Sequence, residues 1–166
     1  MENQNCYIEF EIQTDKNFVD LKNTFELVKE SKNNENPKPD EYWLAHFPEY
    51  ALKYFYFLDS DKKPPFQTVQ EREFTWHFYS LIELLQINYE IEYIDCFKIS
   101  TKIGRIEYNP FSYPYGGITG LITFFSSFNC TPTIIDDGTS LYQILFKENR
   151  DFAILDLHEP KRQDSS

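Results

Sequence analysis

Residues 118–128 hold the feature that most constrains how this chain can fold, a helix-length segment that is apolar on almost every side. Its apolar positions are Ile118, Leu121, Ile122, Phe124, Phe125 and Phe128. The remaining polarity is mild and lies in a narrow stripe made of Thr119, Thr123, Ser126 and Ser127. A helix with apolar residues nearly all round is normally buried, and this one is too short to span a bilayer. We therefore predict a buried central helix.

The segments on either side of this helix predict how the chain enters and leaves it. Pro110 and Pro114 favour extended backbone in the residues before them, so a strand that precedes them cannot continue into the helix. Two glycines at 116–117 permit a turn that side chains would hinder. After the helix, residues 131–135 have the composition of a buried strand, and the sequence at 136–139 predicts a tight turn.

The chain before this centre predicts further strands and helices. Residues 6–12 alternate polar and apolar side chains, which is typical of a half-buried strand. Helical periodicity begins after Thr14 and returns over residues 68–86, where a capping-box pattern precedes the apolar stripe. Two alternating segments, 89–99 and 102–108, predict an antiparallel hairpin.

The C-terminal part completes the expected architecture. Residues 140–146 favour a strand or a short helix, and residues 151–157 favour a final strand. Residues 158–166 are polar and predict a frayed tail. Because helices and hairpins mix without a regular β–α–β alternation, the sequence predicts an α+β fold. At 166 residues, we expect a single domain, residues 1–166, with a mainly antiparallel sheet and about three helices packed on it.

A formal net charge of −11 restricts the partners of this chain. It repels nucleic-acid phosphates and anionic membrane surfaces, so we expect neither as a partner. The acidity is steepest in residues 1–50, which carry eleven acidic residues and five lysines. We therefore expect a basic protein partner, although many acidic cytosolic proteins have no partner of that kind.

Other sequence features limit the cellular compartment and the kind of chemistry expected for this chain. The three cysteines are too few and too far apart for a disulfide framework. The chain starts without a basic and apolar signal segment, and no stretch approaches the roughly 18 apolar residues of a membrane span. These features predict a cytoplasmic protein. No cofactor motif or zinc-ligand spacing is present, so we expect neither a cofactor nor a metal; His77 is expected to form hydrogen bonds at the edge of the core.

Asp136 and Asp137 are the residues that most resemble a catalytic or metal site. Adjacent carboxylates could bind a divalent cation or act as acid and base. With Tyr113 and Tyr115 beyond the glycine turn, they would form the site of a small hydrolase or transferase. The alternative is structural, because an aspartate before glycine favours a turn in which its carboxylate accepts backbone N–H bonds. Consecutive strand residues also point to opposite faces, so we favour the turn.

Residues 41–58 are densely aromatic and lie in the acidic half of the chain. Tyrosine and tryptophan are enriched at protein interfaces. The candidate binding residues are Glu41, Tyr42, Trp43, Glu49, Tyr50 and Tyr54. The same rings could instead pack in the core with their hydroxyl groups at its rim. The sequence does not separate these alternatives.

Two features carry a resemblance to known proteins. The segment Tyr113–Thr139, which contains YPYGGITGLITFF and IIDDGT, resembles small bacterial proteins of unassigned role. The small, acidic, aromatic-rich chain without catalytic motifs also resembles the immunity proteins that bacteria keep against toxins. That resemblance implies a cytoplasmic, non-enzymatic inhibitor that binds a basic toxin or nuclease domain.

The leading hypothesis is therefore a binding protein that presents an acidic, aromatic surface to a basic protein. The first alternative is the hydrolase or transferase described above, with or without a metal. The second alternative is a homodimeric structural protein whose aromatic patch is buried against a second copy.

Overall fold

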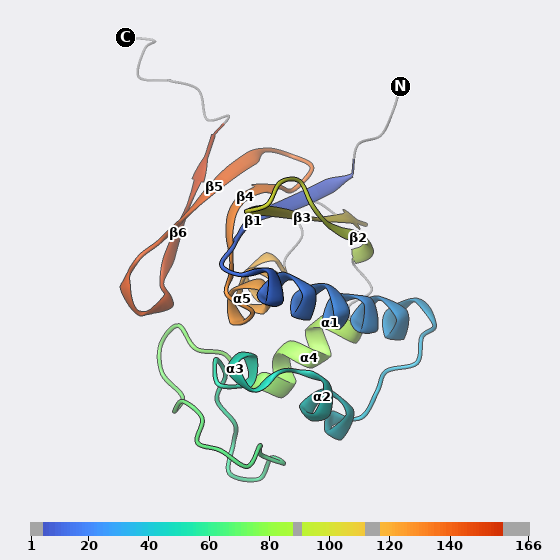
Figure 1. The fold of residues 1–166 in the computed structure, drawn as a ribbon, viewed down its shortest axis with the longest axis vertical. Coiled ribbons are helices and arrows are strands. Elements are labelled where there is room, and N and C mark those ends of the chain that lie inside the picture. The colour runs from blue at the N-terminus through green and yellow to red at the C-terminus, as the bar shows by residue number, and fades with distance from the viewer. Residues whose placement is uncertain (1–4, 88–90, 112–116, 158–166) are drawn as a thin grey trace.

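A computed structural model describes residues 5–87, 91–111 and 117–157 of the chain. Its elements, in chain order, are β1 (Cys6–Ile12), α1 (Asp15–Asn33), α2 (Asp40–His46), α3 (Glu49–Leu52), α4 (Phe78–Ile87), β2 (Ile91–Lys98), β3 (Ile103–Pro110), α5 (Ile118–Ser127), β4 (Cys130–Asp136), β5 (Leu141–Phe146), η1 (Glu148–Arg150) and β6 (Phe152–Asp156). The strands form one six-stranded antiparallel sheet, and the helices gather on one side of it (Figure 1). Helices α1 and α5 pack against the sheet, and α4 packs against both of them. This arrangement confirms the α+β fold that the sequence predicts.

Strand β1 lies inside the sheet, whose order is β2-β3-β1-β4-β5-β6. It pairs with β3 on one side, where Ile8 faces Ile106, and with β4 on the other, where Ile8 faces Ile135. Alternation along β1 buries Ile8 and Phe10 completely on the helical side and directs Glu9 to the opposite face. The predicted hairpin of β2 and β3 forms one edge of the sheet, and the hairpin of β5 and β6 forms the other.

The central helix α5 is buried, as its sequence predicts. Its buried residues are Gly120, Leu121, Ile122, Thr123, Phe124, Phe125 and Ser127. The centroid of the Phe125 ring lies 5.6 Å from that of Phe10, which joins the helix to the middle of the sheet. Gly120 allows a close approach of α4, because a Cβ atom at this position would lie 2.1 Å from Leu84 Cδ2. Across the described ranges, none of the helices combines the length and the hydropathy needed to cross a bilayer.

Helix α1 begins directly after Thr14, where the helical periodicity starts. The Thr14 hydroxyl accepts a hydrogen bond from the Asn17 N–H (3.2 Å), and the Asn17 side chain accepts one from the Thr14 N–H (3.1 Å). This reciprocal cap satisfies backbone donors that the first helical turn leaves free. The face of the helix that carries Phe18, Leu21 and Phe25 is buried.

The helix predicted over residues 68–86 is wrong in its first half, because α4 begins only at Phe78. Phe74, an apolar residue of the segment predicted to be helical, has a φ of 68° and is 43% exposed. The Tyr56 N–H donates to the Trp76 carbonyl (3.0 Å), and the Phe78 N–H donates to the Tyr56 carbonyl (3.1 Å). These tertiary hydrogen bonds hold the residues directly before α4 beside Tyr56, and they outweigh the local helical pattern there.

Gln86 is a buried polar side chain that joins several segments of the helical side. Its Oε1 atom accepts hydrogen bonds from the Lys38 N–H (3.0 Å) and from Trp43 Nε1–H (3.2 Å). The Ser31 hydroxyl lies 3.0 Å from the same oxygen and 2.9 Å from the Asn36 carbonyl. The Nε2 group of Gln86 donates to the Lys38 carbonyl (3.1 Å). Through this one side chain, α4 is bonded to α1, to α2 and to the loop between them.

Candidate functional site

Trp43, one of the six candidate binding residues, lies in the core. It is 0% exposed, and its ring packs edge-on against Tyr42 and at a steep angle against Phe47. Tyr42 is half-buried, and its ring stacks on His46 with 4.0 Å between the ring centroids. These rings stabilise α2 and its packing on α4, so Trp43 cannot touch a partner directly.

The two glutamates of the predicted surface are each matched by a lysine. Glu41 Oε2 lies 3.2 Å from Lys62 Nζ, and Glu49 Oε2 lies 3.1 Å from Lys53 Nζ. Such exposed pairs contribute little to stability, but each one offsets a negative charge where it stands.

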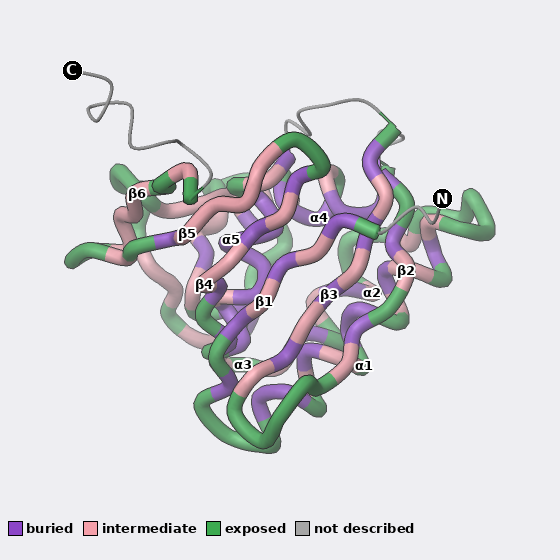
Figure 2. Tube along the Cα trace, turned by 90° about the horizontal axis from the view of Figure 1, so that it is seen from above, coloured by how far each residue is buried: buried purple, intermediate pink, exposed green. Residues whose placement is uncertain are grey.

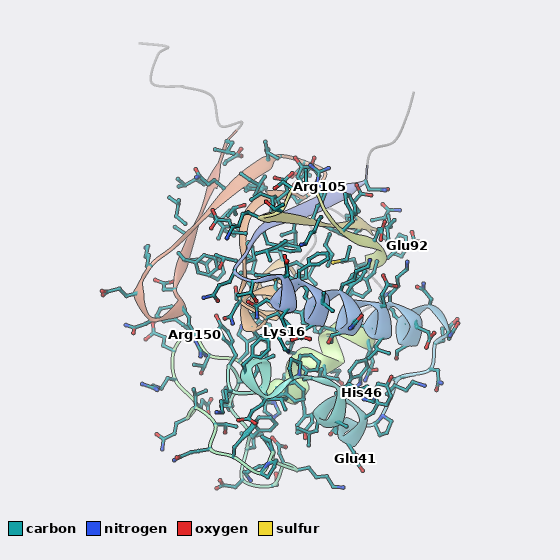
Figure 3. All side chains as sticks on the ribbon, in the orientation of Figure 1. Lys16, Glu41, His46, Glu92, Arg105 and Arg150 are labelled. Carbon is teal, nitrogen blue, oxygen red and sulfur yellow. The ribbon has the colours of Figure 1, made fainter. Side chains whose placement is uncertain are left out.

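Tyr50 and Tyr54 are also engaged within the protein. The Tyr50 hydroxyl donates to Asp20 Oδ2 of α1 (2.8 Å). The guanidinium carbon of Arg150 lies 3.6 Å from the centroid of the Tyr54 ring. Figure 3 shows Glu41 at the opposite end of the molecule from Arg105 of the sheet. Of the six candidate residues, Trp43 is buried, the two glutamates are exposed and the three tyrosines are half-buried.

Asp136 and Asp137 form the turn that an aspartate before glycine predicts. Asp136 Oδ1 accepts a hydrogen bond from the Gly138 N–H (2.9 Å). Asp137 Oδ1 accepts hydrogen bonds from the N–H groups of Thr139 (2.8 Å) and Ser140 (3.0 Å) and from the Thr139 hydroxyl (2.7 Å). Both carboxylates thus stabilise the connection between β4 and β5.

The described residues offer few groups for metal or nucleophilic chemistry. Within these ranges, no three His, Cys, Asp or Glu side chains come together in a way that could hold a metal ion. Burial raises the pKa of Cys96 and of Cys130 to about 12, so both thiols stay protonated near neutral pH and are poor nucleophiles. Tyr113 and Tyr115, the other members of the predicted hydrolase or transferase site, lie outside the described residues.

One chain of hydrogen bonds does join three residue types that occur in catalytic triads. His77 Nε2 lies 2.6 Å from Asp61 Oδ2, and His77 Nδ1 lies 2.9 Å from Ser80 Oγ. His77 immediately precedes α4 and Ser80 lies in its first turn, so this contact joins the His77 side chain to the start of the helix. The Asp61 contact fastens the preceding loop to the same helix. As predicted, His77 is hydrogen-bonded at the edge of the core, with a side chain that is 15% exposed.

The Asp61–His77 pair predicts a pH-dependent contribution to stability. Burial raises the pKa of Asp61, but the hydrogen bonds from His77 and the Leu58 N–H outweigh it, so the folded-state pKa lies below the ordinary value of 3.8. A carboxyl with a lowered pKa stabilises the folded state above its unfolded pKa, and this stabilisation is lost as the pH falls through the folded pKa.

Denaturant titrations of the wild type and of Asp61→Asn measure this contribution. The difference between their free energies of unfolding should be largest near neutral pH and should shrink as the pH falls below about 4. A difference that stays constant down to about pH 2 would contradict a contribution from the ionised carboxylate.

The face of the sheet opposite the helices is not covered by any element of the described chain (Figures 1 and 2). The pleat directs six carboxylates to this face: Glu9 and Glu11 of β1, Glu92 and Asp95 of β2, Glu107 of β3 and Asp136 of β4. Among the described strand residues of this face, Arg105 is the only basic one. It forms an ion pair with Glu9, and its guanidinium carbon lies 4.0 Å from the centroid of the Tyr7 ring.

The β5–β6 end of the same face is apolar. Leu145 and Leu155 are 42% and 46% exposed, and Leu157, just after β6, is 45% exposed. Strand β6 is also the last strand of the sheet, so its outer edge has no strand partner among the described residues. Exposed apolar groups beside an unpaired edge are typical of a contact surface. We call the six carboxylates together with these three leucines the open sheet face.

Comparison with known proteins did not identify a relative of this chain. The chain matches no protein-family model, and searches of curated proteins and of solved structures found no significant match.

Proposed function

We propose that this protein is a non-enzymatic binding protein that holds a basic protein partner against the open sheet face, in the manner of an immunity-type inhibitor. The observation that carries the proposal is the composition of that face, with six carboxylates against one guanidinium and three exposed leucines beside them. A concentrated negative field speeds the encounter with a basic partner. Desolvated apolar side chains then supply the contacts that slow its release.

The size of the open sheet face is adequate for this role. Six strands spaced about 4.8 Å apart give a width of about 25 Å, and their length gives about 20 Å in the other direction. The projected area is therefore about 500 Å². Because side chains protrude from the sheet, the accessible area is larger and approaches the roughly 800 Å² that each partner buries in a stable complex.

The same observations weigh against the two alternatives. Asp136 and Asp137 use their Oδ1 atoms for turn hydrogen bonds, which favours the binding proposal over a hydrolase or transferase at that place. Two copies stacked symmetrically on the open sheet face would bring their carboxylates together, and this repulsion disfavours a homodimer there.

Charge reversal on the open sheet face tests the proposal. In the variant Glu92→Lys/Glu107→Lys, association with the basic partner should slow about tenfold or more, because the steering field is removed. The matched control is Glu30→Lys/Glu83→Lys, which changes the net charge equally at exposed positions of α1 and α4. Partners would be captured from a lysate of the source cells, identified by mass spectrometry and measured by surface plasmon resonance at low and high salt.

The two variants make the outcome decisive. A basic partner that is kept by the wild type and the helix control, but lost by the sheet variant and by raising the salt, supports the proposal. A partner that binds both variants equally, or binding that salt does not weaken, would contradict it. A dimer detected by light scattering and disrupted by the sheet variant would favour the homodimer instead.

A further inference from the structure

Arg150, at the turn between β5 and β6, stands between two surface grooves. The first has a volume of about 560 Å³ and is lined in part by Arg72, Phe74 and Asn149. The second has a volume of about 510 Å³ and is lined in part by Tyr54 and Phe146. Arg150 lines both, and Figure 3 shows it at the turn of the β5–β6 hairpin, beside the loops of the helical side. A ligand in the first groove would therefore meet Arg150 directly.

The guanidinium of Arg150 is held in a fixed place. Its Nη1 donates to the Tyr54 carbonyl (2.5 Å), and its central carbon lies 3.6 Å from the centroid of the Tyr54 ring. Burial lowers the pKa of Arg150, Tyr54 partly offsets this effect, and the nearby positive charge of Arg72 lowers the pKa further. Arg150 remains charged at neutral pH despite this cost. The contact with Tyr54 uses one nitrogen, so the guanidinium retains further donors that can bind an anion.

Within the described part of the chain, neither arginine is neutralised by a carboxylate. Among the described residues, no carboxylate forms an ion pair with Arg72 or Arg150, although Glu73 also lines the groove. In a chain with a net charge of −11, acidic partners for two neighbouring arginines are plentiful. Two cations near each other repel, so this arrangement is stabilised when an anion binds between them.

The backbone around the groove is held in uncommon conformations. Phe74, Asn149 and Arg150 have φ values of 68°, 61° and 69°, and all three line the same groove. For phenylalanine and arginine this region costs energy, and such residues concentrate at binding sites. The conformation leaves the Phe74 ring 43% exposed at the groove.

We propose that this groove binds a small organic anion, whose carboxylate or phosphate group is held by Arg72 and Arg150 and whose apolar or aromatic body lies against Phe74. Guanidinium groups bind both kinds of anion through paired N–H donors. A ring on the ligand can stack on the exposed Phe74 side chain. The residues that line this groove do not include any of the open sheet face, so the site goes beyond the proposed function.

Calorimetric titration with phenyl phosphate, benzoate and inorganic phosphate tests the site. At least one of the two ring-bearing probes should bind saturably with a Kd of about 1 mM or tighter. In Arg72→Gln that affinity should fall about tenfold or more, because a charge-assisted hydrogen bond is lost. The matched control is Lys102→Gln, which removes the same charge at an exposed position in the β2–β3 turn and should bind as the wild type does.

A second variant tests the aromatic contact. Phe74→Asn keeps a residue that tolerates positive φ and should weaken the ring-bearing probes while leaving inorganic phosphate unchanged. The ratio of phenyl phosphate to benzoate affinity identifies which anion the site prefers. The proposal is overturned if no probe saturates at about 10 mM, or if Arg72→Gln binds the probes as tightly as the wild type.

Discussion

The Gln86→Leu variant is expected to unfold with a free energy about 3 kcal/mol lower than that of the wild type. Leucine can occupy the space of the glutamine, but it cannot accept the hydrogen bonds from the Lys38 N–H and Trp43 Nε1–H. Gln86 is 8% exposed, and Trp43 is fully buried. A buried donor that loses its acceptor costs about 1–3 kcal/mol, and here two donors lose the same acceptor.

Chemical denaturation followed by circular dichroism measures this loss. The matched control is Gln67→Leu, the same substitution at an exposed loop position, which should change the free energy of unfolding by less than about 0.5 kcal/mol. In a double-mutant cycle, Trp43→Phe should cost less in the Gln86→Leu background, because the indole donor has already lost its acceptor. Equal midpoints for Gln86→Leu and the control would show that the network does not stabilise the fold.

The Gly104→Ala variant is expected to lose about 2 kcal/mol of stability through steric overlap between strand β3 and the core. A Cβ atom on Gly104 would lie 2.4 Å from Phe10 Cε1 and 2.6 Å from Phe10 Cζ. The Phe10 ring is 0% exposed, and it packs between Phe18 and Phe125 at centroid distances of 6.4 Å and 5.6 Å. Because its neighbours hold the ring in place, the strand backbone must yield.

Thermal and denaturant unfolding can show whether steric overlap causes the loss of stability. The measurements compare Gly104→Ala, Phe10→Leu and the double variant. If overlap is the cause, Gly104→Ala should cost less in the Phe10→Leu background, because leucine leaves room for the new methyl group. Strictly additive losses would assign the effect to the strand backbone and not to the ring.

The central helix could be predicted because its signal does not depend on its neighbours. A segment that is apolar on nearly every side must be buried wherever the chain places it. The same holds for the cap at Thr14, where the Asn17 hydrogen bonds act within one turn. The predicted helix fails over residues 68–77 for the opposite reason, because the residues just before α4 form hydrogen bonds to Tyr56, which lies outside this segment of the sequence.

The sites were harder to predict than the elements. Composition alone does not distinguish a buried tryptophan from an exposed one. Trp43 is buried because it contacts Gln86 and Phe47, and these tertiary contacts are not visible in the local sequence. The alternation of residues 6–12 does direct Glu9 and Glu11 away from the core. Whether helices cover these two glutamates depends on the side of the sheet to which each connecting segment runs. The local sequence pattern does not indicate that side.

The position of β1 between β3 and β4 has a consequence for how the chain reaches its native state. Ile8 lies opposite Ile106 and Ile135, so the middle of the sheet closes only across very long loops. Contacts of such high sequence separation slow folding. During synthesis β1 leaves the ribosome well before either neighbour exists, and its free edges are open to wrong pairing until then. We therefore expect the pairing of β1 with β3 and β4 to come later in folding than the two local hairpins.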